Sequence, residues 1–216
     1  RSTFRQSKHY SGVRMQQGRV QLDSDWNENL DILLHRIETE TIDVIGECGV
    51  PIHNAAFGVV TDFSTLSADE KQLLTKLGFD SLTPGDFYLT RGRAYVDGIL
   101  IENDVTLPFT YQPYVLPTGG GEITAPGIYL LYLDVWQRHI TALEDPYIRE
   151  VALGGPDTAT RSQVIWQARL AQVGDLKDTI TCADDLHPWP DQSTGTLRAR
   201  YTNGQSLVQG QVVLSN

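Results

Sequence analysis

The carboxylates best suited to bind a metal ion lie in the stretch Asp23-x-Asp25-x-Asn27, which begins like a calcium-binding loop. Such a loop needs a glycine at its sixth position for a sharp turn and a glutamate at its twelfth to supply two oxygens. Here these positions hold Glu28 and Leu34. We therefore interpret the acids as the negatively charged first turn of a helix, and we predict no metal site.

Glu144 and Asp145 are the best candidates for hydrolysis, because Trp136 and His139 lie near them in the sequence. A glycosidase needs two carboxyl groups that face each other across the sugar, and adjacent residues of one chain do not provide that geometry. Asp145 also precedes a proline, which is typical of a helix N-cap. A polysaccharide-active enzyme stays an alternative here, but we expect no catalytic residue.

The remaining reactive side chains show no spacing that indicates a cofactor. The 5 histidines include no H-x-H or H-x-x-x-H pair, and Cys48 and Cys182 are far apart, so we expect two buried free thiols. A nucleophile elbow, a phosphate-binding loop and a dinucleotide fingerprint are all missing from the sequence. The sequence therefore predicts neither an enzyme nor a cofactor.

The charge of the chain is divided unevenly. The 216 residues carry a formal charge of −10 and a pI of about 4.8, which argues against a nucleic-acid partner. Residues 1–22, which we call the basic arm, contain no acid and carry +5, so the rest of the chain carries −15. We expect an extended arm that binds an acidic protein surface through Arg5, Lys8, Arg14 and Arg19.

A long amphipathic helix follows the arm. Apolar residues recur at helical spacing from Trp26 and Leu30 onward until Gly46, which predicts a helix of about 20 residues. We assign residues 1–46 to the basic arm and a docking helix, with Trp26 and Leu30 in the assembly interface. Residues 47–85 form a connector, in which Ser67 and Glu70 are spaced as a capping box before a short helix that ends at Gly78.

Residues 86–174 show the alternation of an antiparallel β domain. Strands are expected at 87–89, at 94–96 and 99–101 around an Asp97-Gly98 turn, and at 105–111, 128–136 and 162–170, with a short helix at 145–151. We interpret 128–136 as a central strand buried on both faces. The 175–216 segment is predicted to be loop-rich, with short strands at 197–201 and 211–214, and to lead to further domains.

The fold class that follows is α+β, with the arm and helix in front of a mostly antiparallel β domain that contains one or two short helices. The most apolar run, 128–136, is interrupted by Asp134 and is too short to span a membrane. No signal peptide is visible, so we expect synthesis in the cytoplasm.

Residues 8–28 read KHYSGVRMQQGRVQLDSDWNE, and residues 131–145 and 149–158 read LYLDVWQRHITALED and REVALGGPDT. These stretches resemble the opening signature and central block of an uncharacterised bacterial domain family. That family is found at the front of large multidomain proteins, some with parallel β-helix repeats, and in gene clusters for phage-tail-like contractile injection systems.

The resemblance implies a structural component of such a system, in the baseplate or an attached fibre or spike, which anchors a larger polypeptide through its arm and helix. Its partners would be other baseplate or tail proteins and copies of itself. Its location would be the assembled particle, extracellular or membrane-associated when mature. The alternative is a fibre module that binds a glycan or another surface component.

Overall fold

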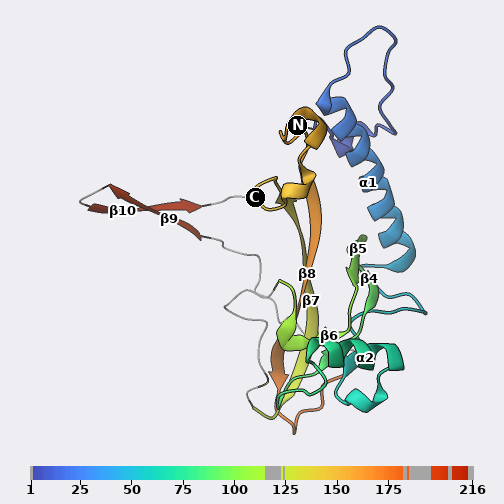
Figure 1. Ribbon diagram of the computed structural model, residues 1–216, viewed down its shortest axis with the longest axis vertical. Coiled ribbons are helices and arrows are strands. Elements are labelled where there is room, and N and C mark those ends of the chain that lie inside the picture. The colour runs from blue at the N-terminus through green and yellow to red at the C-terminus, as the bar shows by residue number, and fades with distance from the viewer. Residues whose placement is uncertain are drawn as a thin grey trace. The chain divides into compact units, whose positions relative to one another are not determined.

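The computed structural model describes residues 2–114, 123, 125–181 and 184, and the backbone of two strands at 196–203 and 206–213 (Figure 1). The fold is α+β, with mostly antiparallel sheets, as the sequence predicts. The chain divides into two compact units. The first contains Arg1–Ala125 and Leu131–Leu170, and the second contains Pro126–Leu130 and Ala171–Asn216.

The long helix α1 spans Asp23–Ile45 and ends at Gly46. Asp23 and Asp25 lie in its first turn, where the positive end of the helix dipole stabilises them. The N-cap is Leu22, whose side chain cannot accept a hydrogen bond, so the start of the helix has no side-chain cap. In the basic arm, one turn of 3-10 helix, η1, spans Gln6–Lys8.

The first sheet has the order β1-β4-β5 and is antiparallel, with β1 at Cys48–Gly49, β4 at Gly92–Val96 and β5 at Ile99–Asn103. The β4–β5 turn has φ angles of 47° at Asp97 and 76° at Gly98, as a type I′ turn requires. This confirms the predicted hairpin. Cys48 is exposed rather than buried, because its two-residue strand lies at the edge of the sheet.

The second sheet has the order β2-β3-β6 and packs against helix α2. Its strands are β2 at Val59–Val60, β3 at Tyr88–Leu89 and β6 at Leu107–Pro108, while α2 spans Ala68–Leu77 after the 3-10 turn η2 at Phe63–Thr65. The predicted capping box between Ser67 and Glu70 is confirmed. The expected strand at 105–111 is mostly wrong, because the chain turns after Pro108 into the 3-10 helix η3 at Phe109–Tyr111.

Two long strands, β7 at Ile128–Ile140 and β8 at Arg161–Gly174, pair with each other. Asp134 pairs with Arg169 at 2.9 Å and Arg138 with Gln163 at 3.0 Å, so the strands are antiparallel. Alternate β7 residues, including Leu133 and Val135, pack on the first sheet, but no residue from 128 to 136 is fully buried. The prediction of a central strand buried on both faces is therefore wrong.

The connection between β7 and β8 contains two 3-10 turns, η4 at Pro146–Ile148 and η5 at Val151–Leu153, where one short helix was expected. In the second unit, β9 at Thr196–Asn203 and β10 at Ser206–Val213 form an antiparallel hairpin. The strands are longer than predicted. The expected loop between Asp184 and β9 lies almost entirely outside the described residues.

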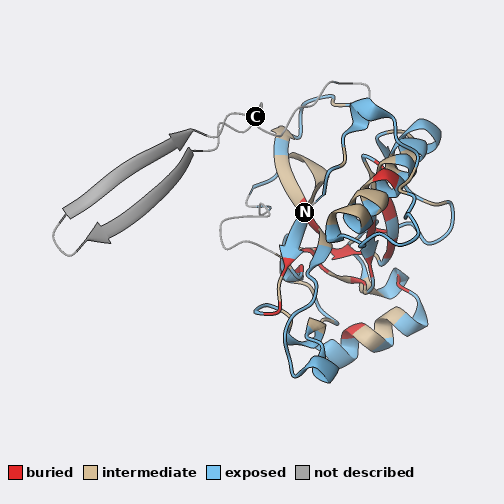
Figure 2. Cartoon of the chain, turned by 90° about the horizontal axis from the view of Figure 1, so that it is seen from above, coloured by how far each residue is buried: buried red, intermediate tan, exposed pale blue. Residues whose placement is uncertain are grey.

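Buried residues of the first unit lie in the strands and in the helices and connecting segments that pack against them (Figure 2). Ala94, Ile101 and Trp166 form one cluster with Phe57, whose ring meets the indole edge-on with centroids 4.8 Å apart. The indole nitrogen of Trp166 donates a hydrogen bond to the carbonyl oxygen of Glu102 at 2.9 Å. A single core therefore joins β8 to the β4–β5 hairpin.

Gly98 offers a test of how the hairpin docks on α1. A Cβ atom there would lie 2.8 Å from the Cα of Glu38, whereas a Cβ at Gly78, which has a similar φ of 80°, would meet nothing within 4 Å. Gly78→Ala should cost about 1 kcal/mol through the left-handed backbone alone. Gly98→Ala should cost about 1–3 kcal/mol more, because of the collision. Chemical denaturation of both variants measures this difference, and equal losses would contradict the docking.

Candidate functional site

Helix α1 carries a row of apolar side chains that the chain leaves uncovered. The exposed fractions are 60% for Trp26, 55% for Leu30, 45% for Leu33, 58% for Ile37 and 78% for Val44. With about 100° between successive helical residues, these side chains lie within an arc of about 60°. We call them the apolar seam. Ile32 is the one buried residue of the helix.

The basic arm lies along a different face of α1. The Thr3 hydroxyl donates a hydrogen bond to Glu28, the Phe4 ring lies 5.7 Å from the ring of His35, and the Val13 backbone N–H donates to Asn29 Oδ1 at 3.1 Å. Glu28 and His35 are each about 140° around the helix from the nearest seam residue, whereas Asn29 is about 40° from Leu33. The arm therefore packs mainly on the polar side of α1, and the side chains of the seam stay exposed.

The last turns of α1 contact the first sheet, again without covering the seam. The Asp97-Gly98 turn lies against the backbone at Glu38, and the Ile45 side chain lies against Gly49. Glu38 is about 100° from Ile37 around the helix. Contacts with the arm and the sheet together hold the helix by its polar face and its C-terminal end.

The seam has the spacing of a coiled-coil interface. Its first four residues follow one another at intervals of four, three and four. Val44 comes seven residues after Ile37, and Glu40 occupies the seam position between them. This is the heptad pattern, in which the two apolar positions of each repeat face a neighbouring helix. Trp26 and Leu30, the two helix residues that the sequence predicts for the interface, lie next to each other on it.

The four predicted arm residues are all exposed. Lys8 lies over the ring of Tyr10 at 5.5 Å, and Arg14 and Arg19 line a small hollow together with Asp25. Among the described residues, the structure shows no ion pair that involves Arg5, Lys8, Arg14 or Arg19. Their charges are thus available to another molecule. Sequence periodicity also marked Leu33, Ile37 and Val44, although the predicted site left them out.

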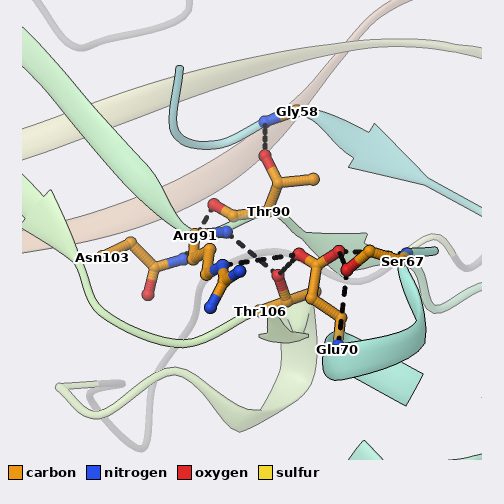
Figure 3. Close-up of polar contacts among 7 residues, drawn as sticks. All are labelled: Gly58, Ser67, Glu70, Thr90, Arg91, Asn103 and Thr106. Carbon is orange, nitrogen blue, oxygen red and sulfur yellow. Dashed lines mark hydrogen bonds and ion pairs between the residues drawn. The ribbon is translucent and has the colours of Figure 1, made fainter. Parts of the chain in front are cut away.

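A second polar cluster surrounds Glu70 at the start of α2 (Figure 3). Thr106 donates to one carboxylate oxygen at 2.5 Å and Ser67 donates to the other at 2.6 Å, while Arg91 lies 4.0 Å away. Burial opposes ionisation, but the hydrogen bonds from Ser67 and Thr106 and the charge of Arg91 outweigh it, so the pKa of Glu70 is lowered. A saturated, ionised carboxylate is poorly suited to proton transfer, and its role is to tie α2 to the strands.

The candidate hydrolytic pair has structural partners as well. Glu144 pairs with Arg138 at 3.5 Å, and Asp145 accepts a hydrogen bond from the Tyr147 backbone at 3.0 Å, which confirms its predicted capping role. In the described part of the chain, no three His, Cys, Asp or Glu side chains are grouped so as to hold a metal ion. No helix among the described residues is long and apolar enough to cross a membrane.

The chain matches the model of DUF6519, a family of unknown function, over residues 1–188. The chain belongs to this family. The matched part includes the basic arm, α1, the two three-stranded sheets and the β7–β8 pair. No curated protein and no solved structure matches the chain.

The lowered pKa of Glu70 predicts a pH dependence of stability. A carboxyl group whose pKa falls on folding stabilises the fold above its ordinary value of 4.5, and this contribution is lost as the pH falls through the folded-state pKa. Glu70→Gln should therefore lower the midpoint of thermal unfolding at pH 7 and flatten its decline below about pH 5. Asp69→Asn, an exposed change in the same helical turn, is the control. If Glu70→Gln left the pH profile unchanged, the cluster would not be the stabilising contact described here.

Proposed function

We propose that this chain is a structural assembly component of a phage-tail-like contractile injection system, which docks on a helix of a neighbouring subunit through the apolar seam. The observation that carries the proposal is the exposure of the seam while the opposite face of α1 is in contact with the arm. In an isolated domain, a heptad row with this exposure would leave large apolar side chains in water, which is unfavourable. Such exposed apolar surface is typical of an interaction site.

The energetics support docking by the seam. Burying one large apolar side chain contributes roughly 1.5–3 kcal/mol, whereas association itself costs roughly 4–15 kcal/mol. Several adjacent side chains on one rigid helix are therefore needed, and the seam supplies them at regular heptad spacing. The helix is already held by the arm and the first sheet, so little further ordering is required when the partner binds.

The charge around the seam indicates the chemistry of the partner. Acidic residues far outnumber the one base, Arg36, along α1, and Glu40 lies within the seam itself. Two copies packed seam to seam would place like charges at the interface, at a cost in binding free energy. A cationic amphipathic helix of another baseplate or tail protein fits better. The exposed bases of the arm can bind an acidic protein surface. The acidic part of a second copy of this chain is one such surface.

The proposal names this particle because residues 8–28, 131–145 and 149–158 resemble a domain family that is found in gene clusters for injection systems. In this role the chain would be made in the cytoplasm, join a baseplate or an attached fibre, and anchor a larger polypeptide. The second alternative, a polysaccharide-active enzyme, has less support, because Glu144 and Asp145 are engaged in an ion pair and a helix cap.

Two sets of variants test the proposal by the amount of chain recovered in purified particles. Leu30→Ala with Ile37→Ala should reduce incorporation about tenfold or more at every salt concentration, because apolar contacts are lost. Replacement of the bases at 5, 8, 14 and 19 by glutamine should reduce incorporation mainly at low salt, because salt screens exposed charges.

Ile42→Ala is the matched control, since Ile42 is 37% exposed on the same helix but lies about 120° or more around the helix from every seam residue. This variant should be incorporated normally. The thermal stability of the free seam variants should be nearly unchanged, because both side chains are exposed. Normal incorporation of folded seam variants would contradict the proposal.

A further inference from the structure

An open cavity of about 580 Å³ lies in the first unit, away from α1 and the basic arm. Its walls come from the end of β5, the segment around η3, and β8, and they include Glu102, Asn103, Asp104, Tyr111, Tyr114 and Gln163. Its volume is in the range of small-ligand sites. We propose that this cavity binds neutral hexose units of a glycan, an activity that goes beyond assembly.

Two tyrosine rings at the cavity are held in place by contacts with their neighbours. Tyr111 is 65% exposed, but its ring lies 4.4 Å from the ring of Phe79. The Tyr114 hydroxyl accepts a hydrogen bond from Gln163 Nε2 at 3.1 Å, and the Arg138 guanidinium lies 5.7 Å from its ring. The electron-rich face of an aromatic ring attracts the C–H groups of a pyranose, and a fixed ring loses little entropy when it binds.

Arg138 positions this tyrosine through a chain of contacts. It donates to Gln163 Oε1 at 3.0 Å while it pairs with Glu144, so both ends of the Gln163 amide are engaged. The carboxylate first considered for hydrolysis therefore supports the cavity wall from behind. This network gives Glu144 a role in the orientation of Tyr114.

The polar groups of the cavity suit hydroxyl donors. Glu102 and Asp104 are exposed carboxylates that can only accept hydrogen bonds when ionised. Asn103 is 4% exposed and its Nδ2 donates to the carbonyl oxygen of Thr90 at 2.9 Å, which fixes the amide at the cavity wall. Sugar hydroxyls can donate to all three side chains. The paired carboxylates repel a sugar acid, so the site favours a neutral ring.

A second hollow, of about 410 Å³, shares Glu102, Asn103 and Asp104 with the first and adds Asn54, Arg91 and Arg93. We call the shared residues 102–104 the acidic ridge, and this ridge is accessible from both hollows. A proline-rich peptide also binds to aromatic grooves, but it has few hydroxyl donors for this ridge.

The proposal can be tested by binding of the full chain to a glycan array. The array carries neutral hexose oligosaccharides and matched oligosaccharides that contain uronic acid, and calorimetry then measures the affinity for the best ligand. We expect the neutral glycans to bind at least tenfold more tightly than the acidic ones. Tyr111→Ala and Asp104→Asn should each weaken binding about tenfold. Tyr147→Ala, at a side chain that is 97% exposed and outside the cavity, should leave binding unchanged.

Asp104→Asn keeps the test decisive if Tyr111→Ala disturbs packing on Phe79. The proposal would be overturned if no neutral oligosaccharide bound, if both cavity variants bound as well as the original chain, or if a proline-rich peptide occupied the cavity instead. The seam variants Leu30→Ala and Ile37→Ala should bind glycan normally, so failure here is distinct from failure of the assembly proposal.

Discussion

The contact between the polar face of α1 and the basic arm is the interaction on which the rest of the account depends. An amphipathic helix usually buries its apolar stripe in its own domain. Here Glu28, Asn29 and His35 receive the arm, and the Asp97-Gly98 turn lies on the backbone at Glu38. The helix is therefore held from one side, and its apolar seam is left on the other.

This arrangement has a cost for the isolated chain, because the seam exposes apolar surface that a self-contained domain would bury. The first unit tolerates that cost because its core lies elsewhere, in the packing of β8 and β7 on the β4–β5 hairpin and of α2 on β3. The Glu70 cluster adds polar contacts that tie α2 to the segment before β6. The core that stabilises the unit is thus separate from the seam that we propose for assembly.

Local features of the fold could be predicted from the sequence wherever one short segment determines the structure. The Asp97-Gly98 turn, the Ser67–Glu70 capping box and the C-terminal ends of α1 at Gly46 and of α2 at Gly78 are of this kind, since turn chemistry and helix caps act over a few residues. Burial could not be predicted in the same way. The apolar run at 128–136 suggested a central strand, but β7 has β8 as its one strand partner in the described structure, and Cys48 is exposed at a sheet edge.

The candidate sites, too, could be predicted only where a local sequence pattern marks them. Helical periodicity identified the seam, yet periodicity cannot tell which face of a helix turns toward its own chain. The cavity proposed to bind sugars could not be predicted, because residues 102–114 meet Gln163 and Val164 of β8 only in the folded chain. Tyr111 and Asp104 belong to no motif, and the role proposed for them follows from the neighbours that the fold gives them.

Hydroxyl-radical footprinting of the unmodified chain is the most direct test of docking by the seam. It compares the accessibility of Trp26 in the free chain and in the purified particle. Trp26 is 60% exposed in the free chain, and Tyr147, at 97%, provides a reference outside α1. If the seam docks, oxidation of Trp26 should fall severalfold on assembly, relative to that of Tyr147. Equal oxidation of Trp26 in both states would contradict docking by the seam.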